Sequence, residues 1–219
     1  MQSRKLLPLS GIAFVAIVLG SVIGFGGGTP GTGASAEELA SFYGDHTVSQ
    51  GIGTFVLAAS APFIVLFGVA LAGLPARDNG GTSVWSYVVL AGAILVAGAV
   101  LVTAFVHFAL ANGGDEEISP TALQALNSLD GNTWMAFNPA FGVMMLGAAG
   151  LLLSAGVVRW LGWIALVLGV AAFIPFADFF GLLGTLIWIV VTSAALARGV
   201  GSALRMTELD GQVTVPTNV

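Results

Sequence analysis

The feature that most constrains this chain is a series of apolar runs, each long enough to cross a lipid bilayer. A transmembrane helix needs about 20 apolar residues to cross roughly 30 Å of hydrocarbon. Such runs occupy residues 6–27, 51–74, 84–110, 135–158, 160–178 and 180–198. The last two belong to one continuous apolar stretch, which is too long for a single helix and is divided at Asp178. The sequence therefore predicts an all-α membrane protein with six spans.

The composition supports a membrane protein and excludes several kinds of site. Of the 219 residues, 57% are hydrophobic and only 8% are charged, whereas a typical soluble domain has about 25% charged residues. The chain has no Cys, which excludes disulfides, thiolate metal sites and cysteine nucleophiles. Its basic residues form no cluster, so nucleic-acid binding lacks the positive patch that it requires.

The charged residues are segregated between the two sides of the membrane that six spans define. The basic residues all fall on one side: Arg4, Lys5, Arg77, Arg159, Arg198 and Arg205. Acidic residues gather in two long loops on the other side: Glu37, Glu38, Asp45, Asp115, Glu116, Glu117 and Asp130. Because cytoplasmic loops carry an excess of Lys and Arg, we expect both termini in the cytoplasm, with residues 199–219 as a cytoplasmic tail.

The N-terminus has some features of a signal peptide. The basic stretch MQSRK precedes an apolar run, and ASA stands at residues 34–36. However, the apolar run is longer than the 7–15 residues of a signal peptide, and a stretch rich in Gly and Thr separates it from ASA. We therefore expect an uncleaved first helix, and an N-terminus that began at Glu37 would contradict this.

The six spans pair into three hairpins that point outward, and two of the outer loops contain helix signals. Ser35 and Glu38 have the spacing of a capping box. Ser119 followed by Pro120 suits the start of a second helix. Apolar residues then recur at helical spacing in both loops. We expect two short amphipathic helices on the outer surface, which either cap the bundle or form a lid over a cavity.

Two residues within the spans carry specific expectations. Pro62 lies near the middle of its span, where proline should bend or interrupt the helix. Trp188 lies near the middle of the last span, where its indole N–H needs a partner. We expect Trp188 to make a contact between helices rather than to stack on a ligand.

A group of polar residues near the outer ends of the spans is the candidate functional site. Ionisable side chains inside a membrane are costly and usually functional, but the expected spans carry none near mid-depth. We expect a similar depth in the membrane, near the outer surface, for His107, Asn138 and Asp178. His46 and Asp45 are expected to join them from an outer loop. This cluster is either a hydrogen-bond network that ties the hairpins together or a ligand or metal site. Zinc would need three or four such ligands.

Asp178 has two interpretations of its own. As a membrane-buried acid it would mark a proton or ion path. However, it follows Arg159 by about 19 residues, which at 1.5 Å per residue is nearly a full hydrocarbon thickness. We therefore expect a tight outer turn between Pro175 and Gly181, in which Asp178 caps the last helix.

No motif of a soluble enzyme occurs in the chain. There is no glycine loop followed by Lys, no HExxH and no GxSxG. The leading hypothesis is a non-enzymatic membrane protein without a cofactor or metal, which binds a lipid, a small apolar molecule or a membrane-protein partner, or forms a homo-oligomer. The alternative is a small transporter or pore, which needs a polar cavity that passes mid-depth. Intramembrane catalysis would require His107 beside Asp178 in a water-accessible pocket.

Three segments carry a resemblance to known sequences: LPARDNG (74–80), LQALNSLDGNTWMAF (123–137) and VVRWLGWIALVLGVAAF (157–173). An outer element with Tyr43 and His46 and a turn from Arg159 to Trp163 add to it. In these features the chain resembles a large group of uncharacterised multi-pass membrane proteins from high-GC Gram-positive bacteria. The resemblance implies a six-helix bundle in a bacterial plasma membrane, and it implies no activity.

Overall fold

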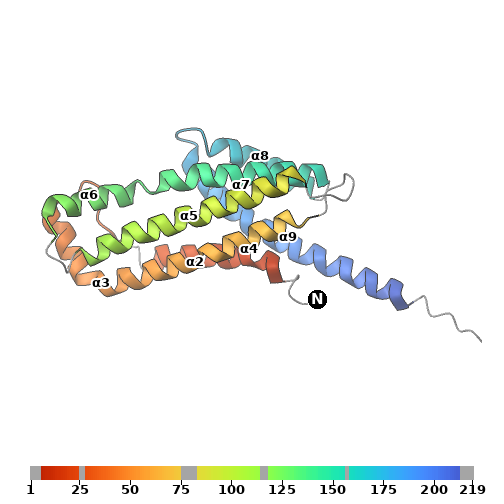
Figure 1. The fold of residues 1–219 in the computed structure, drawn as a ribbon, viewed down its shortest axis with the longest axis horizontal. Helices are drawn as coiled ribbons and strands as arrows, with labels where there is room; N and C mark the ends of the chain where they lie inside the picture. The colour runs from red at the N-terminus through yellow and green to blue at the C-terminus, as the bar shows by residue number, and fades with distance from the viewer. Residues whose placement is uncertain (1–5, 25–27, 75–82, 114–117, 156–157, 213–219) are drawn as a thin grey trace, which may run out of the picture.

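The computed structural model describes residues 6–24, 28–74, 83–113, 118–155 and 158–212, with the backbone alone at 178 and 200–212. All regular structure in these residues is helical. The elements are η1 (Leu7–Leu9), α2 (Ser10–Gly24), α3 (Ala36–Ala59), α4 (Ala61–Ala72), α5 (Val84–Asn112), α6 (Pro120–Gly131), α7 (Trp134–Ala155), α8 (Arg159–Ala171) and α9 (Asp178–Gln212). They form an elongated bundle with α6 at one end, and α9 leaves the bundle at the opposite end (Figure 1).

Five stretches of helix in the described residues are long and apolar enough to cross a membrane. They are Leu7–Gly24, Ala36–Ala72, Val84–Asn112, Pro120–Ala155 and Phe179–Gly199. They contain most or all of the expected first, second, third, fourth and sixth spans. The expected fifth span, 160–178, is shorter in the structure, because α8 has 13 residues and a length of about 20 Å. By length alone, α8 falls short of the roughly 30 Å of hydrocarbon.

The turn at residues 172–177 ends α8 before the expected span is complete. Pro175 lacks an amide hydrogen and disfavours helical backbone in the residue before it. Phe176 has a φ of 74°, a left-handed conformation that a continuous α-helix does not contain. Asp178 then begins α9. α8 and α9 therefore form a hairpin, and its apex, residues 172–177, is called the hairpin tip below.

The two predicted amphipathic helices differ from each other in the structure. α6 is a separate helix, and the Ser119 hydroxyl accepts a hydrogen bond from a backbone N–H in its first turn. The other expected helix is not separate, because residues 36–43 form the first turns of α3. Ser35 caps α3 by accepting the Glu38 N–H at 3.2 Å, as its spacing predicts. No proline lies between this cap and residue 59, so the helix continues directly toward the second span.

The second span is interrupted where Pro62 predicts. α3 ends at Ala59 and α4 begins at Ala61, with Pro62 in the first turn of α4. Proline is tolerated there because a first-turn residue needs no intrahelical N–H bond. α3 and α4 are thus two segments of one long helical arm, which packs along α5.

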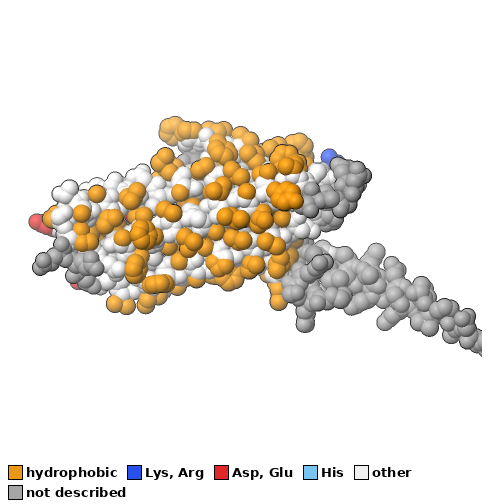
Figure 2. Space-filling view, viewed as in Figure 1, with side chains coloured by type: hydrophobic (Ala, Val, Ile, Leu, Met, Phe, Trp, Pro, Cys, Tyr) orange, Lys and Arg blue, Asp and Glu red, His pale blue; other side chains and the backbone are white. Residues whose placement is uncertain are grey.

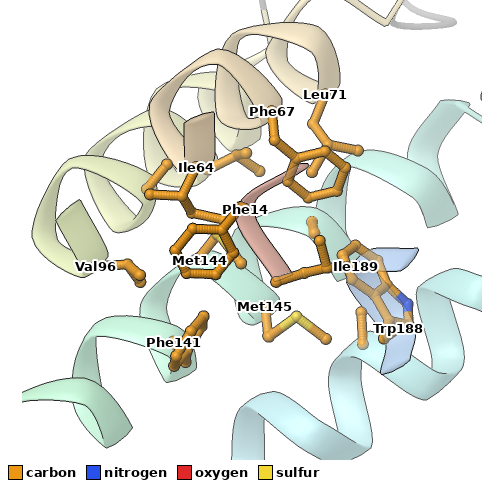
Figure 3. Close-up of a cluster of buried hydrophobic side chains, with 14 of the residues drawn as sticks. Phe14, Ile64, Phe67, Leu71, Val96, Phe141, Met144, Met145, Trp188 and Ile189 are labelled. Carbon is orange, nitrogen blue, oxygen red and sulfur yellow. The ribbon is translucent and has the colours of Figure 1, made fainter. Parts of the chain in front are cut away.

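Small residues allow α5 and α7 to approach closely at the centre of the bundle. A Cβ atom added at Gly92 of α5 would overlap the backbone of Met144, and one added at Gly147 of α7 would lie 2.6 Å from the Val89 backbone N. Figure 3 shows the side chains that fill the adjacent core, with Met144 and Met145 near Phe14. Close backbone packing of this kind stabilises helix pairs in lipid, where burial from water cannot.

Trp188 joins α9 to α8, as predicted. Its indole N–H donates to the backbone oxygen of Leu161 at 2.9 Å. The side chain is 2% exposed, and its ring meets the ring of Phe67 edge-on with centroids 6.3 Å apart. The predicted helix–helix contact is confirmed.

The α8–α9 hairpin covers only part of α7. Gly169 of α8 packs on Leu146, and Phe173 of the hairpin tip packs on Gly142. α7 continues for eight further residues, about 12 Å, from Gly142 to Trp134. The hairpin therefore leaves the α6 end of α7 uncovered.

The surface of the bundle is mostly apolar between its two ends. Figure 2 shows hydrophobic side chains spread over the visible face, acidic side chains at the α6 end and a basic side chain at the opposite end. α9 continues to Gln212, so the expected boundary between span and tail at 198 is not a helix end.

Candidate functional site

His107 of α5 is held at both ring nitrogens by residues from two other helices. Its Nδ1 lies 3.0 Å from Asp130 Oδ2 of α6, and its Nε2 lies 2.9 Å from Gln50 Oε1 of α3. The side chains of His107 and Asp130 are 17% and 19% exposed, and Gln50 is buried. This network joins α3, α5 and α6 at one end of the bundle.

The polar residues of the site follow helical spacing on two facing helices. Gln50 and Thr54 are four residues apart on α3, and Thr103 and His107 are four residues apart on α5. Residues at this spacing lie on the same face of a helix, one turn apart. Since α3 packs against α5, the two faces bring polar side chains together at one end of the bundle.

A cavity of about 160 Å³ adjoins the network. Its walls come from α2, α3, α5, the end of α6 and the turn between α6 and α7. Besides His107, Gln50 and Asp130, the polar wall residues are Ser21, Thr54, Thr103 and Thr133. We call this space the His107 cavity. Its volume exceeds what a single water molecule needs, and its walls carry several potential hydrogen-bonding groups.

One wall hydroxyl has no partner among the described residues. Ser21 donates to the Gly53 oxygen at 2.9 Å, and Thr54 donates to the Gln50 backbone oxygen at 2.8 Å. The Thr103 hydroxyl, in contrast, is buried without any hydrogen bond to the described part of the chain. Leaving a buried hydroxyl unsatisfied costs about 1–3 kcal/mol. Because the oxygen itself is buried beside the cavity, a bound molecule would satisfy it once the Thr103 side chain rotates toward the cavity.

The hydrogen bonds of the ring depend on its protonation state. A neutral imidazole has one donor and one acceptor nitrogen, and a protonated ring has two donors. With Nδ1–H donating to Asp130, an Nε2–H donor to Gln50 Oε1 belongs to the protonated ring. Rotation of the Gln50 amide would instead present its N–H to a neutral ring. In both states Gln50 occupies Nε2 of the ring.

α6 covers the network and is anchored on both sides of it. The Asn127 amide donates to the Gly31 oxygen at 2.9 Å, which ties α6 to the segment before α3. Leu123 of α6 packs with Leu39, Tyr43 and Leu110 in a second buried cluster. The cover over the His107 cavity is thus built from both polar and apolar contacts.

Of the five residues predicted to form one cluster, His107 is the member that the described network and cavity contain. His46 is exposed and bonds the Phe42 oxygen of its own helix at 2.8 Å, and Asp45 beside it is exposed. Asn138 is buried on α7 and has an interaction of its own. These three residues are absent from the wall of the His107 cavity.

Asp178 does not lie at the depth of His107. It begins α9 next to the hairpin tip, which is level with Gly142 of α7. Because Gly92 packs on Met144, that level corresponds to about residue 94 of α5. His107 lies about 13 residues further along α5, or roughly 20 Å. The side chain of Asp178 is outside the described part of the structure.

Sequence reasoning placed the other members of the site elsewhere. Asp130 was expected only as an acid of an outer loop, and Thr103 and Gln50 were not assigned to the site. The available signal was the pair of four-residue spacings, Gln50 with Thr54 and Thr103 with His107. These spacings predict two polar helix faces, but they do not indicate that the two faces contact each other.

The site offers too few ligands for zinc. His107 and Asp130 are two potential ligands, and a structural or catalytic zinc site uses at least three. Within the described residues no group of three His, Cys, Asp or Glu side chains is placed to hold a metal ion. The metal alternative for this site therefore gains no support.

The chain was compared with protein-family models, with curated proteins and with solved structures. None of these comparisons gives a match. The geometry of the His107 cavity is therefore the basis for assigning a function.

Proposed function

We propose that this chain is a non-enzymatic protein of a bacterial plasma membrane that binds a lipid-like molecule in the His107 cavity. The observation that carries the proposal is a cavity lined by several polar residues in a largely apolar bundle, beside the Thr103 hydroxyl, which has no partner among the described residues. A hydroxyl left unsatisfied by the protein is stabilised when a ligand supplies the missing hydrogen bond.

The depth of the cavity supports a ligand with one polar and one apolar part. Trp134 lies at the α6 end of α7, where an aromatic residue at the membrane surface is expected. Thr133 and Asp130 of the cavity wall lie just beyond Trp134. The cavity is thus at the level of lipid headgroups, with hydrocarbon beginning directly below it.

We also propose that the α6 end faces outward and that both termini are cytoplasmic. The basic residues favour this orientation. α2, the α3–α4 arm, α5 and α7 would cross the membrane, and the short α8 would enter it and the longer α9 would return as the third hairpin. Because α8 and α9 would enter and leave on the same side, the number of membrane crossings is even whether or not the hairpin tip reaches the outer surface.

Single cysteines test this orientation, because the natural chain has none. We expect a membrane-impermeant maleimide to label Thr121→Cys, in α6, in intact cells. Ser83→Cys, at the other end of α5, should react only after the cells are lysed. Labelling of Ser83→Cys in intact cells, with Thr121→Cys protected, would reverse the proposed orientation.

Removal of the Thr103 hydroxyl tests the proposed ligand site. Protein purified in a mild detergent is expected to retain about one lipid-like molecule per chain, measured by native mass spectrometry. Thr103→Val should lower this retention about tenfold, the effect of one lost hydrogen bond of about 1.4 kcal/mol. Thr103→Val should also leave the ligand-free protein no less stable, because it removes an unsatisfied group.

Thr192→Val is the matched control. Thr192 of α9 also has a buried hydroxyl without a partner among the described residues, but it is not part of the cavity wall. Its variant should retain the ligand as the natural chain does. An empty natural protein, or equal retention by both variants, would refute the proposed function.

A small transporter is the second candidate, and buried hydroxyls favour it. Ser60, Thr192 and Ser193 lack partners among the described residues and lie farther from α6 than Thr103 does. The core between them contains Phe14, Phe67 and other fully buried apolar side chains, which supports a closed bundle instead. Uptake of small solutes by protein-containing liposomes, above the rate of empty ones, would favour the transporter.

A further inference from the structure

The His107 cavity is not sealed from the surface. Val22 of α2 lines it and is 55% exposed. Ser21 and Val22 of α2 line the cavity together with Asp130 at the end of α6 and Thr133 in the turn before α7. We therefore place the opening beside the exposed Val22, between α2 and the start of α7.

The short α8–α9 hairpin is the reason that this opening exists. α9 packs on α2 and α8 packs on α7, so the hairpin fills the space between α2 and α7 along part of the bundle. The hairpin tip stops at the level of Gly142, about 12 Å before α7 ends. None of the residues that line the cavity belongs to α8 or α9.

The opening is bounded by apolar side chains toward the middle of the bundle and by a backbone segment at the α6 end. Toward the middle of the bundle, Phe14 of α2 and Phe141 of α7 belong to the buried apolar core (Figure 3). The exposed hairpin tip presents Phe173 and Phe176, at 52% and 94% exposure. At the α6 end, the Gly31 oxygen accepts the Asn127 amide, so the segment before α3 reaches across to α6.

The charges of the cavity select the headgroup. Asp130 is a carboxylate, and no Lys or Arg occurs between Lys5 and Arg77 or between Arg77 and Arg159, the segments that supply every wall residue. A phosphate would therefore meet the like charge of Asp130 in a partly buried site, where such repulsion is poorly screened, and the basic side chain in the wall, His107, already contacts Asp130 and Gln50 with its two ring nitrogens. A hydroxyl, in contrast, donates to a carboxylate oxygen and accepts from the Thr103 hydroxyl.

We infer that the ligand is a neutral lipid with a hydroxyl-bearing headgroup, of the acylglycerol type, which enters sideways from the outer leaflet between α2 and α7. Its headgroup occupies the His107 cavity, and its acyl chain lies on α2 above the aromatic hairpin tip. This inference rests on the proposed function, and it adds the chemical class of the ligand and the access route.

Spin-labelled lipids test both additions. Val22→Cys, labelled with bimane at the opening, is reconstituted into nanodiscs that contain doxyl-labelled diacylglycerol or doxyl-labelled phosphatidylglycerol at equal mole fraction. From the quenching we obtain the fraction of each lipid next to the label. We expect this local fraction to exceed the bulk mole fraction at least threefold for diacylglycerol and to equal it for phosphatidylglycerol. Thr103→Val in the same background should remove the excess.

A labelled Phe55→Cys variant is the control for lipid that merely contacts the surface. Phe55 is 68% exposed and lines an apolar groove between α3 and α5, outside the His107 cavity. Both lipids should quench this variant at their bulk values. Equal or stronger excess quenching by phosphatidylglycerol at Val22→Cys would overturn the headgroup class.

The failure of the access route is distinct from the failure of the proposed function. A ligand retained in a Thr103-dependent manner, with no excess quenching at Val22→Cys by either lipid, would overturn the inference alone. No retained ligand together with no excess quenching would overturn the proposed function as well.

Discussion

Gly92→Ala is expected to destabilise the bundle by about 2–3 kcal/mol or more. The added methyl group would overlap the backbone N and Cα of Met144, where α5 and α7 make their closest approach. A flexible side chain can move away from such a contact, but a helix backbone moves only with the whole helix. Overpacking of a well-packed core typically costs 1–3 kcal/mol, and backbone contact places this site at the upper end. Unfolding in mixed micelles with increasing SDS measures the change.

Gly98→Ala is the control on the same helix. A Cβ atom at Gly98 meets nothing within 4 Å, so the variant should be as stable as the natural chain or up to about 1 kcal/mol more stable, because Ala favours a helix interior over Gly. Because both variants make the same chemical change, the difference between them isolates the contact of α5 with α7. Equal stability of the two variants would show that α5 and α7 do not pack as described.

His107→Ala is expected to loosen α6 while it leaves the α5–α7 core intact. The substitution removes the partner of the Asp130 carboxylate and of the Gln50 amide at once. Hydrogen bonds to charged groups contribute about 1.5–3 kcal/mol. We expect amide hydrogen exchange in residues 120–131 to become about tenfold faster or more, with little change around Met144.

A double-mutant cycle with Asp130→Ala separates the pair from its surroundings. The two single variants and the double variant should give a coupling energy of about 1–2 kcal/mol, within the range for residues in contact. His46→Ala is the matched control, since His46 bonds only its own helix in the described contacts. It should leave exchange in α6 unchanged. Additive effects of His107→Ala and Asp130→Ala would contradict a direct interaction.

The hydrophobic runs predicted most of the fold because the length of an apolar helix is a local property. The interruption before α4 and the caps at Ser35 and Ser119 were predicted for the same reason, since each depends on a few adjacent residues. The early end of α8 was not predicted. The hairpin tip consists of apolar residues, including Phe173 and Phe176, so that its composition matches that of a span. The left-handed conformation of Phe176 is visible only in the structure.

The site was predicted in part for a related physical reason. His107 was selected by its depth, which follows from its position along one helix. Its partners Asp130 and Gln50 come from two other helices, and the direction in which α6 folds back over α5 determines whether they meet. No local pattern specifies that direction. Asp178 was placed at the depth of His107 by counting residues along a full-length span, and the shorter α8 removes that placement.

What occupies the His107 cavity in a membrane is the most direct test of the proposed lipid site. A structure of the protein extracted in native-lipid nanodiscs, with a bound antibody fragment to aid alignment, would answer this. We predict elongated density that begins beside Thr103 and Asp130 and continues between α2 and α7 toward the hairpin tip. A cavity closed by the surrounding side chains, or one that holds only isolated water molecules, would contradict the account.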